Sequence, residues 1–147
     1  MSEISRLDLS EFAEVRSLLG PAPQLEPQPF LAVAVSPAAI AATLKLAFPA
    51  AVEYRGRVFR ASAFEPANID RWFTQLGDPV AVERVVNHVH LWDVMADSED
   101  VDREAQLLLA PLAQCWTAAL CLALPDRELT VLATPDGGYG PELTFHS

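Results

Sequence analysis

A run of 20 residues without a charged side chain, from Ala105 to Leu124, constrains the fold of this chain more than any other feature. Such a stretch must be shielded from water by a membrane, by the core of a domain or by another subunit. Apolar side chains recur along it at alternating spacings of four and three residues, as on one face of an α-helix. The residues in this pattern are Val101, Ala105, Leu108, Leu112, Cys115, Ala119 and Leu122. We therefore expect a long helix buried at the centre of a domain.

A transmembrane helix is the first alternative for this run, because 20 apolar residues can span a bilayer. However, Gln106 and Gln114 would need hydrogen-bond partners within the lipid. The charged residues that flank the run show no one-sided excess of basic residues, which would orient a membrane helix. The sequence thus favours a domain core, with a subunit interface as a further alternative. Pro111 lacks an amide N–H and clashes with the preceding turn, so a kink or a break is expected there.

Size and charge limit the class of protein. The 147 residues, 51% of them hydrophobic, suffice for a single domain over residues 1–147. The sequence starts without the basic and apolar pattern of a signal peptide, so we expect a cytoplasmic protein that does not associate with membranes. The net charge of −10 argues against binding to nucleic acids and to anionic membrane surfaces. It fits either solubility alone or an acidic surface for a basic partner.

Helix signals recur along the chain. We expect a helix over residues 1–20, in which Asp8 is the N-cap and Glu11 completes a capping box, and a proline-rich connector over residues 21–29. Ser36-Pro37 predicts the start of a helix that ends near Pro49. Further helices are expected over residues 66–76 and 79–85, and the long apolar helix is expected after residue 98.

Strand signals alternate with these helices. Strands are expected over residues 30–35, in a hairpin over residues 50–63, and over residues 86–95, 128–134 and 142–146. Residues 80–95 also fit a helix, but β-branched and aromatic residues favour a strand in their second half. The order of elements predicts an α+β domain. Its mixed, mainly antiparallel sheet of about five strands would pack against the long buried C-terminal helix and shorter helices.

The sequence His88-Val89-His90, with Asp93 close by, is the best candidate for a metal or catalytic site. On a strand, the spacing of two places both imidazoles on one face, where they can share a divalent metal ion, whereas on a helix they would point to nearly opposite sides. Asp93 could become a third ligand only past a bend in the strand. Two ordinary histidines, or acid–base catalysis by one of them, are the alternatives. More distant candidates for a third ligand are His146, Glu53 and Asp97.

Three arginines, Arg55, Arg57 and Arg60, gather on the predicted hairpin of an otherwise acidic chain. Guanidinium groups on one hairpin could clamp an anion or a carboxylate of a ligand or partner. They could equally pair with acidic residues of a neighbouring helix or subunit, since charged side chains often protect strand edges. Both interpretations stay open at the level of sequence.

No set of residues forms a complete catalytic or cofactor-binding signature. The sequence therefore predicts an acidic, cytoplasmic and non-enzymatic module that binds proteins, as a homodimer and possibly to another protein, without a cofactor. Residues 30–48 and 105–124 offer more apolar surface than one small core easily hides. The alternative is a small enzyme or ligand-binding protein, dependent on a divalent metal or on histidine, centred on His88 and His90.

Overall fold

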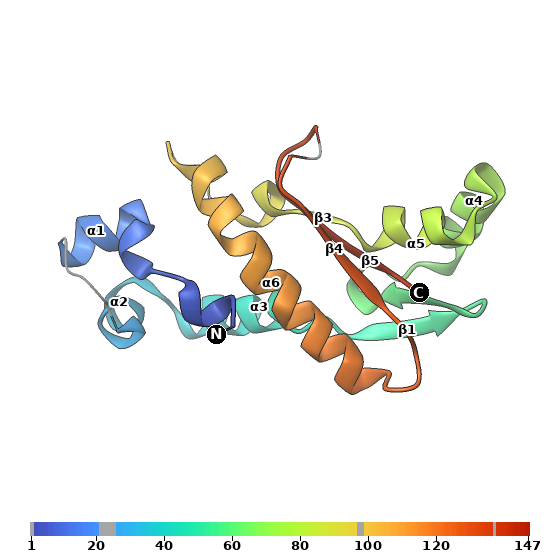
Figure 1. Cartoon of the computed structure of the whole chain (residues 1–147), viewed down its shortest axis with the longest axis horizontal. Coiled ribbons are helices and arrows are strands. Elements are labelled where there is room, and N and C mark those ends of the chain that lie inside the picture. Colours follow the sequence, from blue (N-terminus) through green and yellow to red (C-terminus); the bar gives the residue numbers. More distant parts are fainter. Residues whose placement is uncertain (1, 21–25, 97–98, 137) are drawn as a thin grey trace.

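The computed structural model describes residues 2–20, 26–96, 99–136 and 138–147. Over these residues the chain is an α+β protein, with α1 and α2 at one end of the molecule, α4 at the other and α6 between them (Figure 1). The helices are α1 (Ala13–Leu19), α2 (Pro27–Ala34), α3 (Pro37–Ala47), α4 (Pro66–Leu76), α5 (Pro79–Asn87) and α6 (Val101–Ala123). The strands are β1 (Ala51–Tyr54), β2 (Arg57–Arg60), β3 (Val89–His90), β4 (Thr130–Thr134) and β5 (Glu142–His146).

The strands form two separate antiparallel sheets. β1 and β2 are a hairpin, and β5 lies between β3 and β4 in a three-stranded sheet. Val89 is opposite Leu143 in the β3–β5 pair, and Thr130 is opposite His146 in the β4–β5 pair. The predicted α+β class is thus confirmed, whereas the prediction of one sheet of about five strands is wrong.

Helix α5 explains why the two sheets do not join, because its polar side chains occupy the position between them. In an antiparallel hairpin every second residue turns its N–H and C=O away from the partner strand. In β2 these outward groups belong to Val58 and Arg60. The side chain of Asn87 accepts a hydrogen bond from the Arg60 N–H at 2.8 Å and donates to the Val58 carbonyl at 2.9 Å. It also donates to the Phe145 carbonyl of β5 at 3.1 Å, so one amide links both sheets.

One turn earlier in α5, the fully buried carboxylate of Glu83 makes a second link. Its Oε1 accepts hydrogen bonds from the Val58 N–H at 2.9 Å and from the Ser147 hydroxyl at 2.7 Å. Its Oε2 accepts from the Ser147 N–H at 3.2 Å and lies 3.4 Å from Nη1 of Arg57. A buried charge is costly unless it is paired and hydrogen-bonded, and these donors meet both conditions for Glu83.

The predicted long C-terminal helix is present as α6, and one of its faces supplies the main core. Ala105, Leu109, Trp116 and Leu120 are buried there. The Trp116 ring packs against that of Phe145 in β5, with 5.9 Å between ring centroids. The Trp116 indole N–H donates to the carbonyl of Leu46 at 2.8 Å, which joins the end of α3 to this core.

The rest of α6 is less covered than the sequence predicted. Leu122 is 86% exposed, and 28% of the most apolar 18-residue window of α6 is buried. By length and composition alone the helix could cross a membrane, a test that core helices of soluble proteins also pass. Of the predicted apolar stripe only Ala105 is buried, and the buried face instead includes Leu109, Trp116 and Leu120. A kink or a break was predicted at Pro111, and the helix continues from Val101 through Pro111 to Ala123 without a break.

Residues 30–35 were predicted as a strand but belong to helices and their termini, since α2 ends at Ala34 and Val35 caps it. A short apolar run does not by itself distinguish a strand from a helix. Pro27 decides the outcome here, because it occupies the first helical position, where no amide N–H is needed. Of the predicted connector, residues 21–25 lie outside the described residues and residues 27–29 are part of α2.

The predicted helix over residues 1–20 is divided into two 3₁₀ helices, Ile4–Arg6 and Leu9–Glu11, followed by α1. Asp8 is an N-cap as predicted, but of the second 3₁₀ helix, where it accepts the Ser10 N–H at 2.9 Å. The amide of Ala13 at the start of α1 instead donates to Oε1 of Glu104 on α6, at 2.7 Å. The first turn of α1 is therefore stabilised by a distant residue, which a local capping pattern does not reveal.

The turns and caps that were predicted from a few adjacent residues are confirmed. The Ser36 hydroxyl accepts the Ala39 N–H at 3.1 Å and so begins α3. Gly77 ends α4 in the left-handed conformation, with φ of 69°. Arg55 and Gly56, with φ of 52° and 73°, form the two-residue turn of the β1–β2 hairpin.

Residues 80–95 form a helix followed by a strand, as predicted, but the helix is longer and the strand shorter than predicted. Helix α5 extends to Asn87, two residues beyond the predicted end, and the predicted strand 86–95 is reduced to Val89 and His90. Residues Leu91–Val94 form a 3₁₀ helix. This extension places Asn87, four residues after Glu83, on the side of α5 from which both side chains contact the sheets.

We predict that Glu83→Ala lowers the free energy of unfolding by about 3 kcal/mol, because it leaves Arg57 and several backbone donors without their buried acceptor. Urea denaturation followed by circular dichroism measures this loss. Glu53→Ala, at an exposed position of β1, is the matched control and should change stability by less than about 0.5 kcal/mol. Equal effects of the two substitutions would contradict the proposed importance of the buried carboxylate.

Candidate functional site

The structure brings His88 and His90 together on one side of the chain. His88 caps the C-terminus of α5 in an extended conformation, and His90 follows in β3, so the strand-like spacing holds although the strand has two residues. Their rings meet edge to face with 4.9 Å between centroids. Directly opposite His90 in β5 is Glu142, whose Oε2 lies 3.9 Å from Nδ1 of His90. The two histidines and this carboxylate therefore form one cluster.

A cavity of about 340 Å³ lies beside this cluster and is lined by Ala81, Arg84, Val85, His88 and Glu142. The Nδ1 atom of His88 contacts the Val85 carbonyl of the last turn of α5. In the described part of the chain, Nδ1 of His90 is buried without a hydrogen-bond partner. Glu142 and Arg84 were not foreseen from the sequence, because cross-strand register and the packing of α5 on β5 bring them here.

The predicted metal site has the two imidazoles of His88 and His90 but lacks a complete set of ligands among the described residues. Over residues 2–20, 26–96, 99–136 and 138–147, no group of three His, Cys, Asp or Glu side chains is arranged to hold a metal ion. Asp93 is exposed on the 3₁₀ helix that follows β3. His146 lies at the far end of β5, opposite Thr130, and Glu53 is on the other sheet. Asp97 lies outside the described residues.

The three arginines of the hairpin take part in three different sets of contacts. Nε of Arg55 lies 3.2 Å from Asp70 of α4, and its guanidinium group stacks over the Phe73 ring. Arg57 pairs with Glu83 and donates to the carbonyl of Ser147 at 2.9 Å. Arg60 donates to the Ser62 hydroxyl at 2.9 Å and to the His88 carbonyl at 3.2 Å, and burial lowers the pKa of its guanidinium group. Arg55, Arg57 and Arg60 therefore do not form one anion-binding site.

Helices α2 and α3 form the third candidate surface, which we call the α2–α3 surface (residues 27–48). This stretch contains a single charged residue, Lys45. Nevertheless almost all of its side chains are exposed or half-buried, and Val33 and Leu44 are 69% and 55% exposed. The large apolar residues exposed on it are Leu31, Val33, Ile40, Leu44 and Phe48. The sequence indicated that residues 30–48 carry more apolar surface than one core hides, but residues 30–35 were predicted as a buried strand, whereas their side chains are exposed or half-buried.

The loop between β4 and β5 contacts the histidine cluster and the 3₁₀ helix after β3. The Tyr139 ring lies 6.0 Å from the His90 ring, and a methyl group at Gly140 would overlap the Trp92 indole. Gly138 has the same φ of 82° as Gly140 but open space around its α-carbon.

We predict that Gly140→Ala destabilises the protein by about 1 to 2 kcal/mol more than Gly138→Ala, because both substitutions share the backbone strain and only the first displaces Trp92. Thermal denaturation monitored by Trp fluorescence compares the two variants. If both lose the same stability, the close approach of the loop to Trp92 does not contribute.

We also predict that Zn²⁺ binds the wild-type protein weakly and is lost on dialysis, because His88 and His90 lack a third ligand among the described residues. Elemental analysis after dialysis and thermal shift with added Zn²⁺ measure this. The His88→Ala/His90→Ala double variant should abolish any shift. Stoichiometric zinc retained after dialysis would instead support a complete metal site at this cluster.

Three places have thus been defined: the histidine cluster with its cavity, the hairpin arginines and the α2–α3 surface. The three arginines make contacts within the chain. The histidine cluster with its cavity and the α2–α3 surface therefore remain as candidate sites that face solvent. Comparison of the chain with family models, with curated proteins and with solved structures gave no match.

Proposed function

We propose that this protein is a non-enzymatic, cytoplasmic protein-binding module that associates with a second copy of itself through the α2–α3 surface. The observation that carries the proposal is the exposure of two successive helices with one charged residue in 22. Proteins that act as monomers rarely expose contiguous apolar patches of more than a few hundred Å². An exposed apolar surface of this kind is typical of a protein interface.

Charge supports a second copy as the occupant. The chain carries a net charge of −10, so two copies repel each other over most of their surface. The α2–α3 surface is where two copies can meet with little repulsion between like charges, because only Lys45 is charged there. Homodimer interfaces are also more apolar than other protein surfaces and are depleted of charged residues at their centre.

The side chains of α3 suit the packing of one helix against another. Ile40 and Leu44, four residues apart, lie on the same face of α3, and the neighbouring Ala41 is small, which favours close approach of a second helix. In a dimer with two-fold symmetry each residue contacts the same patch of the other copy. A single substitution therefore acts twice at such an interface.

A second candidate function rests on the histidine cluster. The adjacent rings of His88 and His90 and the neighbouring cavity favour a ligand-binding protein or a histidine-dependent enzyme. Imidazole groups beside a cavity can transfer protons near neutral pH. The zinc measurement and the double histidine variant described above test the metal-dependent form of this candidate.

We predict that light scattering during gel filtration gives the wild-type protein twice its chain mass of 16.0 kDa. Leu44→Glu should reduce this mass to that of one chain, because each copy would then bury a carboxylate at the interface. The measurement is made at several protein concentrations, since dissociation is favoured by dilution.

Leu76→Glu is the matched control, because Leu76 is an exposed leucine at the end of α4, at the other end of the molecule from α2 (Figure 1). It should leave the mass unchanged. A wild-type mass of one chain at all concentrations would refute self-association. A dimer that survives Leu44→Glu would place the interface elsewhere.

A further inference from the structure

A second apolar feature lies between the N-terminal segment, α2 and the first half of α6. It is a pocket of about 380 Å³ whose walls include Leu9, Phe12, Val15, Phe30, Leu31 and Leu108. Ligand pockets run from about 300 to 1,000 Å³, so this one is at the small end of the range. It has room for a bulky apolar side chain.

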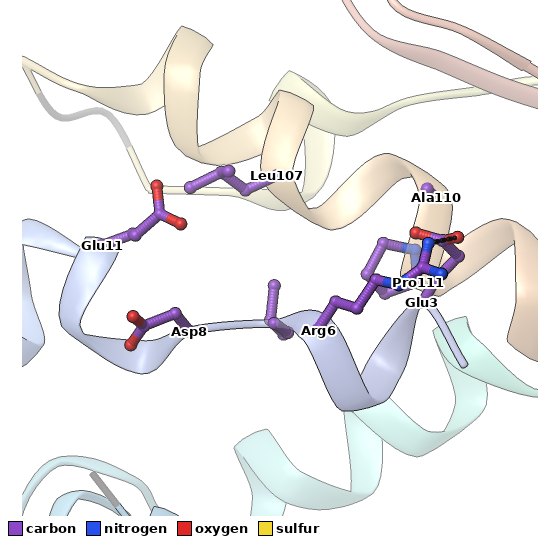
Figure 2. Close-up of a pocket in the computed structure, with 8 residues that line it drawn as sticks. Glu3, Arg6, Asp8, Glu11, Leu107, Ala110 and Pro111 are labelled. Atoms are coloured by element: carbon purple, nitrogen blue, oxygen red, sulfur yellow. Dashed lines mark hydrogen bonds and ion pairs between the residues drawn. The ribbon is translucent and has the colours of Figure 1, made fainter. Parts of the chain in front are cut away.

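A smaller hollow of about 120 Å³ lies on the other side of the N-terminal segment, and Leu7 lines both cavities. Figure 2 shows the Glu11 carboxylate next to Leu107 of α6, Asp8 on the N-terminal segment, and the paired Arg6 and Glu3 beside Pro111. The hollow is therefore apolar on the side of α6 and acidic on the side of the N-terminal segment.

The charges around the two cavities are predominantly negative. Each of the three nearby arginines is in an ion pair: Arg6 with Glu3, Arg16 with Asp100 and Arg103 with Glu11. Asp8, Glu14 and Glu104 line the cavities and are in no ion pair within the described ranges. The Asp8 carboxyl is ionised at neutral pH at its ordinary pKa, and hydrogen bonds from Ser10 lower that pKa further.

We propose that this pocket receives the bulky apolar side chain of an amphipathic partner helix whose other residues include Lys or Arg beside that side chain. The apolar walls supply the anchor site, and the unpaired carboxylates at the two cavities match basic groups that flank it. An acidic partner, including the negatively charged surface of a second copy, would bring like charges together here. The inference rests on the proposed role in protein binding but not on self-association, although Pro27, Phe30, Leu31 and Thr43 of the pocket also belong to the α2–α3 surface.

A labelled peptide tests this proposal by fluorescence anisotropy. The probe is a helical peptide of about 18 residues, or five turns, with Leu and one Trp on one face and Lys on the other. The control peptide has Glu in place of every Lys. We expect the basic peptide to bind at least about tenfold more tightly than the acidic one, with an affinity that falls as salt increases from about 50 to 300 mM.

Two substitutions in the pocket wall test whether the peptide binds in this pocket. Leu9→Glu puts a carboxylate into the apolar wall, and Thr43→Trp fills the pocket with an indole from the exposed side of α3. Each should weaken binding of the basic peptide by about tenfold or more. Because Thr43→Trp introduces no buried charge, it keeps the test valid if Leu9→Glu fails to fold. Glu14→Gln should weaken binding by about two- to fivefold and reduce its salt dependence.

Leu44→Glu and Leu76→Glu serve as controls for the two proposals. Leu76→Glu should bind the basic peptide as the wild type does. Leu44→Glu should bind it at least as tightly, because self-association through the shared residues would compete with the peptide. Leu44→Glu alone should lower the mass measured by light scattering. Absence of binding at about 100 µM peptide, equal binding of both peptides, or full binding by Thr43→Trp would overturn the inference. A monomeric wild type that still binds the basic peptide would refute self-association and leave this inference standing.

Discussion

The arrangement of the two sheets depends on two polar side chains of one helix. Glu83 and Asn87 of α5 bind the outward backbone groups of β2 and, at the same time, the end of β5. Both side chains are fully buried, in a place where an unpaired polar group would cost about 1 to 3 kcal/mol. The helix thus does for the two sheets what a further strand would do in a continuous sheet, and the position of β3 and its histidines follows from it.

Because side chains of α5 take the place of a strand, the sequence predicted the local turns and caps but not the division into two sheets. The hairpin at Arg55-Gly56, the helix start at Ser36 and the helix end at Gly77 were predictable, because each depends on a few adjacent residues. The division into two sheets was not, because Val58 and Glu83 are 25 residues apart and Glu83 and Ser147 are 64 apart. Residues 30–35 were misassigned since an apolar run without periodicity fits a strand and a helix equally.

The candidate sites show the same division between local and distant information. The spacing of His88 and His90 placed their rings on one side as predicted, whereas the neighbouring Glu142 depends on strand register and was missed. The arginines of the hairpin are close in sequence, yet Arg55, Arg57 and Arg60 contact α4, α5 and the chain beyond α5, respectively. The sequence indicated that residues 30–48 carry more apolar surface than one core hides, but it did not show which residues of α2 and α3 are exposed, because hydrophobicity alone does not tell whether a given apolar side chain is covered within the same chain.

The polar caps on β2 also bear on how molecules of this kind aggregate. A strand edge with free N–H and C=O groups is a template on which another chain can add a strand, and long exposed edges are prone to amyloid-like growth. Asn87 and Glu83 engage both backbone groups of Val58 and the amide of Arg60, so this edge offers no such template. Destabilising α5 would therefore do more than loosen a helix, because it would uncover a strand edge to which another chain could add a strand.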